Sequence, residues 1–159
     1  MRKRKRYKPR GINPMAHLTA IMGSRILSKD DVTAMASKPR LALSEISKGK
    51  LTAENWQDLF DGCNLLEQLI RNGKARDPDG LITATQQAIV DVADRHKTTG
   101  STALKAGELN ALLDFCAAYT QVLETVTNQE VFEAFDAMQR RVARVMAEGK
   151  RTPGGIRVE

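Results

Sequence analysis

The chain has 159 residues, of which 42% are apolar and 28% charged, a composition typical of one globular domain and not of a disordered protein. No apolar run approaches the ~20 residues of a membrane-spanning helix. Two cysteines, Cys63 and Cys116, are too few for a disulfide framework, so we expect a reducing, cytoplasmic setting.

The net charge of +6 comes from the first ten residues. They contain seven Lys or Arg, whereas the rest of the chain holds 18 basic and 19 acidic residues. Such a run repels itself, cannot build a core and attracts polyanions. We therefore expect a flexible basic arm at 1–12, a helical domain at 13–149 and a flexible tail at 150–159.

The basic start also raises the question of a targeting segment. The residues after the arm do not form the continuous apolar region of a signal peptide. No acidic residue occurs before Asp30, which leaves a mitochondrial presequence open. Against a presequence, the positive charges are bunched in one run and are not spread along an amphipathic helix.

Two short helices are expected at the start of the domain. Asn13-Pro14 is typical of a helix start and predicts a helix over 14–22 that ends at Gly23. Residues 24–38 are ambiguous. Pro39, in a first-turn position, predicts a second short helix that ends at Lys48.

Four longer helices are predicted from their end signals. Thr52 is a candidate N-cap, and Leu51 and Trp56 have the spacing of a hydrophobic staple, so a helix should run to about residue 72. The turn at 77–80 leads into a helix that ends near 96–100, and the next helix covers about 105–125.

The last helix has the sharpest start. Thr127 and Glu130 form a capping box, and Val126 and Val131 form the matching staple. This helix should run to about Glu148, where Gly149 follows.

Apolar residues in these four helices recur at alternating steps of three and four. Such a repeat keeps one face of each helix against its partners in left-handed packing. The four faces hold Trp56, Leu59, Cys63, Leu66 and Ile70; Ile82, Thr85, Ile89, Val92 and His96; Leu109, Leu112, Cys116, Tyr119, Leu123 and Val126; and Val131, Phe135, Met138, Val142 and Val145. The predicted fold is all-α: a four-helix up-and-down bundle, preceded by one or two short helices and flanked by flexible basic termini.

Patterns that would indicate an enzyme or a metal site do not occur. No Glu-x-x-His is present, and two histidines (His17 and His96) with two separated cysteines do not make a zinc pattern. There is no GxSxG, and the three Gly-Lys pairs lack the upstream glycine of a P-loop. The carboxylate pairs Asp58/Asp61 and Asp91/Asp94 are expected on solvated faces. We expect no catalytic residue, no cofactor and no metal.

Two basic groups are candidates for contact with nucleic acid. Lys and Arg neutralise phosphates, and a tyrosine stacks on an exposed base. The first group is the arm, with Arg2, Lys3, Arg4, Lys5, Arg6, Tyr7, Lys8 and Arg10. The second is Arg140, Arg141 and Arg144, which equally suit the dipole at a helix C-terminus. The arm has two plainer interpretations, a solubilising tail and a nuclear-import signal.

The charge of the middle of the chain limits where nucleic acid can bind. Residues 11–139 hold 12 basic and 17 acidic residues, so contact with DNA or RNA is expected through the ends, without sequence preference. A helix-turn-helix over 39–70 is disfavoured because its second helix is too long and too apolar for recognition.

The stretch from Lys5 to His17 resembles the opening of small proteins encoded in phages and prophages of Gram-negative bacteria. The resemblance implies an accessory protein of the bacterial cytoplasm and implies no catalytic residue. Our leading hypothesis is a non-enzymatic accessory protein that associates with nucleic acid through its arm. The alternative is an inhibitor or adaptor whose acidic bundle face binds a basic host or defence protein. The sequence leaves the oligomeric state open.

Overall fold

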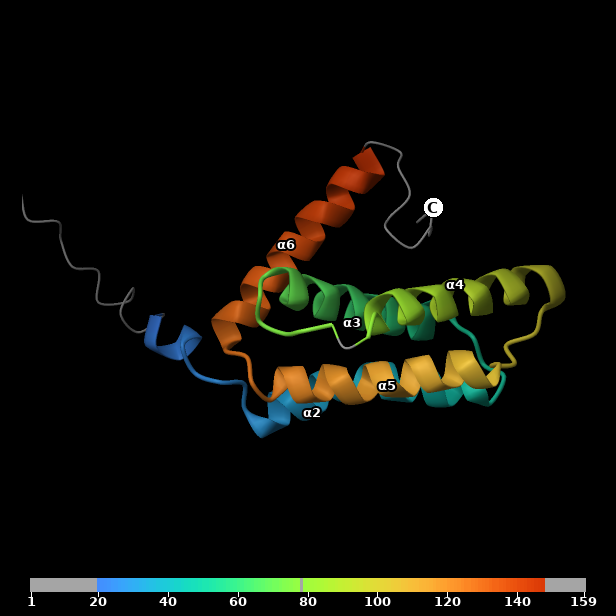
Figure 1. Cartoon of the computed structure of the whole chain (residues 1–159), viewed down its shortest axis with the longest axis horizontal. Coiled ribbons are helices and arrows are strands. Elements are labelled where there is room, and N and C mark those ends of the chain that lie inside the picture. The colour runs from blue at the N-terminus through green and yellow to red at the C-terminus, as the bar shows by residue number, and fades with distance from the viewer. Residues whose placement is uncertain (1–19, 78, 148–159) are drawn as a thin grey trace, which may run out of the picture.

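The structure is a computed structural model that describes residues 20–77 and 79–147. Its long helices are α2 (Lys29–Ser47), α3 (Ala53–Arg71), α4 (Leu81–Thr99), α5 (Ala106–Leu123) and α6 (Asn128–Ala147), preceded by a helical turn at 20–23 (Figure 1). The described ranges contain no strand beyond an isolated bridge between Ile26 and Thr127. The all-α prediction is therefore confirmed for this part of the chain.

Helices α2, α3, α4 and α5 contact one another in a closed ring, and α3 and α5 also meet across it. Figure 1 shows α2 beside α5 and α3 beside α4, with α6 rising obliquely past them. Among the described helices, α6 makes backbone contact with α3 alone. The prediction placed the last helix inside the bundle and left residues before 50 as short helices. Instead it is α2 that packs with α3 and α5. This helix is 19 residues long, and it buries Val32, Ala36, Leu43 and Ile46 in the core.

The predicted helix start at Pro39 is wrong. Helix α2 begins ten residues earlier, where Ser28 Oγ accepts the backbone N–H of Asp31 at 3.1 Å. Pro39 lies inside the helix, where proline removes one backbone hydrogen bond and ordinarily bends the chain. The proline ring is buried opposite Gly62 of α3. A serine at the N-cap position, with Asp30 and Asp31 in the first turn, is the local signal for this helix start.

The predicted ends of the following helices are confirmed. Thr52 caps α3 by accepting the backbone N–H of Asn55 at 3.1 Å. Gly73, just after α3, and Gly100, just after α4, have φ values of +72° and +70°. Only glycine adopts this left-handed conformation without strain, so both positions stop their helices by local geometry.

The capping box at the start of α6 is also confirmed. Thr127 N–H donates to Glu130 Oε2 at 2.9 Å, and Glu130 N–H donates to Thr127 Oγ1 at 3.2 Å. Glu130 also forms an ion pair with Lys74 Nζ at 2.8 Å, which links α6 to the end of α3.

Thr127→Ala is expected to lower the free energy of unfolding by about 1 kcal/mol, because one cap hydrogen bond is lost. Urea denaturation followed by circular dichroism measures the change. Thr125→Ala, at an exposed threonine just before the cap, is the matched control and should change stability by less than about 0.5 kcal/mol. An equal midpoint for wild type and Thr127→Ala would contradict the prediction.

The core is aliphatic, as the composition predicts, with Phe115 at its centre. The predicted inward faces of α3, α4 and α5 are buried through most of their length, although His96 is exposed at the end of α4. The face predicted for α6 is covered only in part. Met138 and Ala134 are buried, whereas Phe135 is exposed and Val131, Val142 and Val145 are half-buried.

Candidate functional site

The predicted arm residues, Arg2 to Arg10, lie outside the described residues, as does His17. The first described residues are tied to the start of α6. Leu27 N–H donates to Val126 O at 3.2 Å, and Asn128 N–H donates to Arg25 O at 3.0 Å. Asn128 Nδ2 also reaches Met22 O at 3.4 Å. The chain therefore arrives from the arm beside the N-terminal end of α6.

The three arginines of α6 do not form one patch. Arg140 is exposed and pairs with Asp136 one turn earlier, at 2.6 Å. Arg144 is exposed, and no carboxylate among the described residues lies within ion-pair distance. Arg141 points to α3, where its Nη2 donates to Glu67 Oε2 at 3.0 Å. Arg141 therefore joins two helices, and Arg140 and Arg144 remain on the outer surface.

Glu67 is the centre of a largely buried polar cluster. Its Oε1 accepts from Arg71 Nε and Nη2 at 3.1 and 2.7 Å, and its Oε2 accepts from Gln86 Nε2 at 3.2 Å and from Arg141. The cluster thus joins α3, α4 and α6. Arg141 Nη1 is buried without a hydrogen-bond partner among the described residues. We assign this cluster a structural role, because every charge in it is directed at protein.

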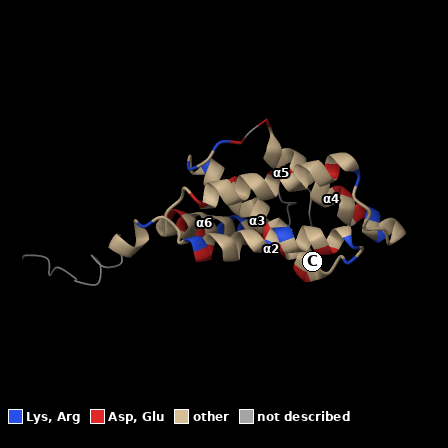
Figure 2. Ribbon diagram, turned by 90° about the horizontal axis from the view of Figure 1, so that it is seen from below, with Lys and Arg blue, Asp and Glu red and all other residues tan. Residues whose placement is uncertain are grey.

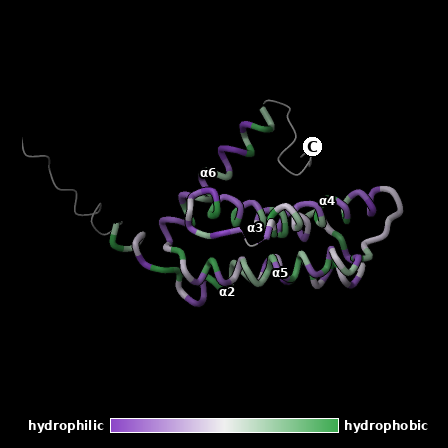
Figure 3. Tube along the Cα trace, viewed as in Figure 1, coloured by the Kyte–Doolittle hydropathy of each residue, from purple (hydrophilic) through white to green (hydrophobic). Residues whose placement is uncertain are grey.

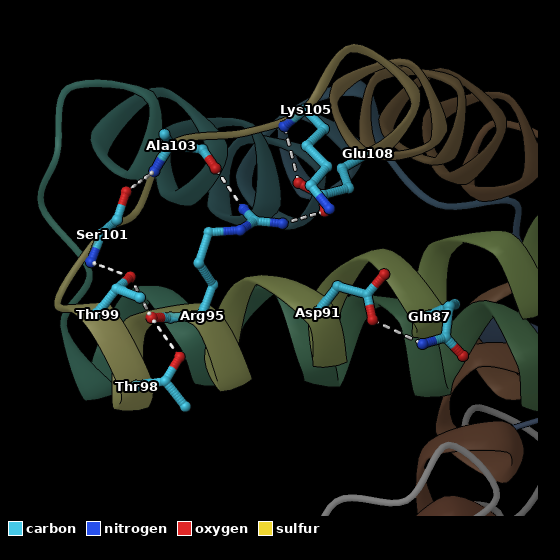
Figure 4. Close-up of polar contacts among 9 residues, drawn as sticks. All are labelled: Gln87, Asp91, Arg95, Thr98, Thr99, Ser101, Ala103, Lys105 and Glu108. Carbon is cyan, nitrogen blue, oxygen red and sulfur yellow. Dashed lines mark hydrogen bonds and ion pairs between the residues drawn. The ribbon is translucent and has the colours of Figure 1, made fainter.

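A second charged cluster holds the loop between α4 and α5 (Figure 4). Arg95 donates to the backbone oxygen of Ala103 and to Glu108 Oε1. Glu108 Oε2 accepts the backbone N–H of Lys105 at 2.8 Å and so caps α5. Burial alone would raise the pKa of Glu108, but Arg95 and the Lys105 N–H lower it more, so the pKa lies below its ordinary value of 4.5.

This shift predicts a pH-dependent contribution to stability. Because the pKa of Glu108 is lower in the folded protein, its contribution is present above about pH 4.5 and is lost as the pH falls through the folded pKa. Glu108→Gln should therefore cost about 1.5–3 kcal/mol at pH 6 and clearly less at pH 3. Urea denaturation at both pH values measures the difference, with Glu124→Gln at an exposed site as control. An equal cost of Glu108→Gln at both pH values would contradict the assignment.

A groove of about 620 Å³ runs between α2, α3 and α6. Its apolar lining includes Met35, Pro39, Leu65, Tyr119, Phe132 and Phe135, and its polar lining includes Lys38, Asp58 and Asp61. We call it the acidic groove. Phe132 is 71% exposed and Phe135 is 42% exposed, so one wall of the groove faces solvent.

The two aspartates of the groove are half-buried, which corrects our expectation of a solvated surface pair. Burial raises the pKa of Asp61, and the nearby Asp58 raises it further, although Gln57 Nε2 donates to Asp61 at 2.7 Å. The pKa of Tyr119 is also raised, chiefly by burial and to a smaller extent by the negative charge of Asp61. The ring of Tyr119 stacks on that of Phe115. Two aspartates and one lysine, Lys38, therefore lie beside the exposed rings of Phe132 and Phe135.

The other cavity, of about 760 Å³, lies between α2 and α5. Arg40 crosses it and donates to Thr120 Oγ1 at 2.9 Å. Its lining carries Lys29, Arg40 and Glu124 among small and aliphatic side chains, so charges of both signs are mixed and no ligand chemistry is indicated.

Both cysteines are buried in the core, as predicted. Burial raises the pKa of Cys63 to about 12 and that of Cys116 to about 11. A thiol with so high a pKa is protonated at neutral pH and is a poor nucleophile. The described residues contain no group of three His, Cys, Asp or Glu side chains placed to hold a metal ion, and none of their helices is both long and apolar enough to cross a membrane.

Basic and acidic positions are interspersed along the ribbon of the described part of the protein (Figure 2), which holds 15 basic and 17 acidic residues. The excess of positive over negative charge in the chain is therefore outside it, chiefly in the arm. Comparisons with models of known protein families, with curated proteins and with solved structures gave no match to this chain.

Proposed function

We propose that this protein associates with nucleic acid through residues 2–10 and uses a four-helix bundle, α2 to α5, as the scaffold that carries this arm. The observation that supports the proposal is the separation of charge: seven basic residues lie in the first ten, and the described part is slightly acidic. Phosphate contact by Lys and Arg provides affinity without reading sequence, so binding is non-specific. As part of this proposal, the resemblance of residues 5–17 to the opening of phage-encoded proteins supports an accessory role in the bacterial cytoplasm.

The arrangement at the start of α6 suits an arm that reaches outward. The chain between Met22 and Leu27 is held to the residues at the start of α6 by hydrogen bonds, so the described chain begins close to that end of α6. Arg140 and Arg144 add positive charge on the outer side of α6 and are secondary contacts in this proposal. Arg141 is excluded from phosphate contact because Glu67 binds it. We assign no catalytic step to any residue.

The salt dependence of binding tests this function. If four to seven arm residues each neutralise a phosphate, log K against log[salt] on a duplex should have a slope of about −4 to −6. A truncated protein that begins at Gly11 should lose most of that slope, whereas Arg140→Gln/Arg144→Gln should keep most of it. Circular dichroism of the truncated protein checks that the helices remain. Titrations of random-sequence duplex at several salt concentrations provide the slopes.

Tyr7 distinguishes single strands from duplexes. Tyr7→Ala should weaken binding to single strands more than to duplexes, because only an unstacked base can lie on the ring. Tyr7→Phe keeps the ring and serves as the matched control. Absence of binding by the full-length protein at low salt would refute the proposed function. It would favour the alternative, an adaptor or inhibitor whose acidic surface binds a basic protein and does not need the arm.

A further inference from the structure

The acidic groove has one apolar wall that is exposed. Phe132 and Phe135 of α6 form this wall, whereas Pro39, Leu65 and Tyr119, which also line the groove, are buried. Figure 3 shows that hydrophobic positions recur along α6, including the half that leaves the other helices. Exposed aromatic side chains beside a cavity of this size are typical of a surface that binds another segment.

The chain itself enters at one end of this groove. Leu27 and Asn128 line that end, and Asn128 Nδ2 donates to Met22 O at 3.4 Å. Met22 and Ile21 are themselves exposed, so the apolar surface continues from the groove to the first described residues. The described chain begins at Ala20, two residues before Met22. The nineteen preceding residues are therefore tethered close to this end of the groove, and their effective concentration at the groove is high.

The length of this segment is sufficient to cross the groove. Along α2 the groove extends from Ala34 to Pro39, about 8 Å at the 1.5 Å rise of a helix. The eleven residues from Arg10 to Ala20 span about 15 Å as a helix and more than 30 Å when extended.

The charge and apolar pattern of the segment match the groove. Ile12, Met15 and Leu18 recur every three residues, and Lys8 and Arg10 precede them. Asp58 and Asp61 lie together on the α3 side, whereas a single Lys38 lies on the α2 side. The excess of negative charge favours a basic occupant.

We propose that residues 8–19 of the same chain dock in the acidic groove, with the three apolar side chains over Phe132 and Phe135 and with Lys8 and Arg10 at Asp58 and Asp61. The docked segment withdraws part of the arm, so a polyanion and the groove compete for the same basic residues. The second half of this inference, competition, rests on the proposed function. The first half, docking, does not.

Dipolar distance measurements on the full chain test docking without nucleic acid. Nitroxide labels at Ala16→Cys, next to the docking side chains, and at Gln129→Cys, which is exposed on the first turn of α6, should give one narrow distance distribution. Cys63 and Cys116 are buried and do not compete for the label. Adding Asp58→Asn/Asp61→Asn or Phe132→Ser should broaden the distribution.

Two matched controls should leave the narrow distribution in place. Asp91→Asn/Asp94→Asn removes the same charge from α4, where Gln87 donates to Asp91 just as Gln57 donates to Asp61. Leu113→Ser removes an exposed apolar side chain from α5. Broad distance distributions in the labelled protein, both with and without the groove substitutions, would overturn the docking. A dimer in which a second copy of the chain occupies the groove, while residues 8–19 stay free, would also overturn it.

Competition has its own readout. If the segment is docked for two thirds of the time, only one third of the molecules have a free arm, and the apparent affinity for duplex is about threefold below that of the free arm. Asp58→Asn/Asp61→Asn releases the segment, so its affinity for duplex should be about three times that of the control Asp91→Asn/Asp94→Asn. A narrow distribution together with equal affinities for the two variants would keep the docking and overturn the competition. Absence of any duplex binding would refute the proposed function, whereas the distance measurement would still decide the docking.

Discussion

Glu67→Leu is expected to lower the free energy of unfolding by about 3–5 kcal/mol, because it removes one partner from a buried group of charges. The Glu67 side chain is 11% exposed and accepts hydrogen bonds from Arg71, Gln86 and Arg141. After the substitution, the guanidinium of Arg141 has no acceptor among the described residues, and its Nη1 already lacks one. Because Arg141 joins α6 to α3, the last helix should also detach at a lower denaturant concentration than the other helices.

The control for this prediction uses the partner of Glu67. The double variant Glu67→Leu/Arg141→Met removes both charges and replaces them with apolar side chains, so it should recover much of the loss. Asp136→Asn breaks the exposed Arg140–Asp136 pair on the same helix and should change stability by no more than about 1 kcal/mol. Urea denaturation of the four proteins measures these differences. A cost below 1 kcal/mol for Glu67→Leu alone would show that the cluster does not hold α6 in place.

Phe115→Ala should be about as destabilising, at about 3–5 kcal/mol, because it empties the centre of the core. The Phe115 side chain has no exposed surface, and its ring lies 5.7 Å from that of Tyr119, centroid to centroid. On its other side the ring abuts Gly62 of α3, where a Cβ atom would lie 3.2 Å from Phe115 Cζ. A Cβ atom at position 62 would therefore crowd the Phe115 ring, whereas it would meet Pro39 at the ordinary contact distances of 3.6 and 3.7 Å.

A double-mutant cycle tests this contact. Alanine stabilises a helix relative to glycine by about 1 kcal/mol. In the wild-type protein, however, the added methyl group must displace the ring of Phe115, so Gly62→Ala should raise the free energy of unfolding only slightly or lower it. In Phe115→Ala the cavity accepts the methyl group, and Gly62→Ala should stabilise by about 1 kcal/mol. The two substitutions should therefore couple by about 1 kcal/mol or more. Strict additivity in denaturation experiments would contradict the packing described.

The helix ends could be predicted from the sequence because each depends on residues within one turn. The cap of Thr52, the reciprocal bonds of Thr127 and Glu130, and the left-handed glycines after α3 and α4 form by contacts of short range. Their geometry is therefore decided by local sequence alone. The same holds for the aliphatic core positions, because an apolar repeat of three and four residues determines which side of a helix is buried.

The candidate site depended on pairs that are far apart in sequence, and these could not be predicted. Arg141 follows Glu67 by 74 residues, and no local pattern distinguishes an arginine that binds a carboxylate from one that faces solvent. Asp58 and Asp61 have the spacing of an ordinary surface pair. They line a groove only because α6 lies beside them.

The sequence by itself determined that the chain is helical, where most helices end, which cysteines are buried and that the positive charge is concentrated in the arm. Only the tertiary structure decided that α2 continues through Pro39, because that ring is buried against another helix, α3, at Gly62. It also decided that, among the described helices, α6 makes backbone contact with α3 alone, since an apolar repeat defines a face but not the helix that will cover it.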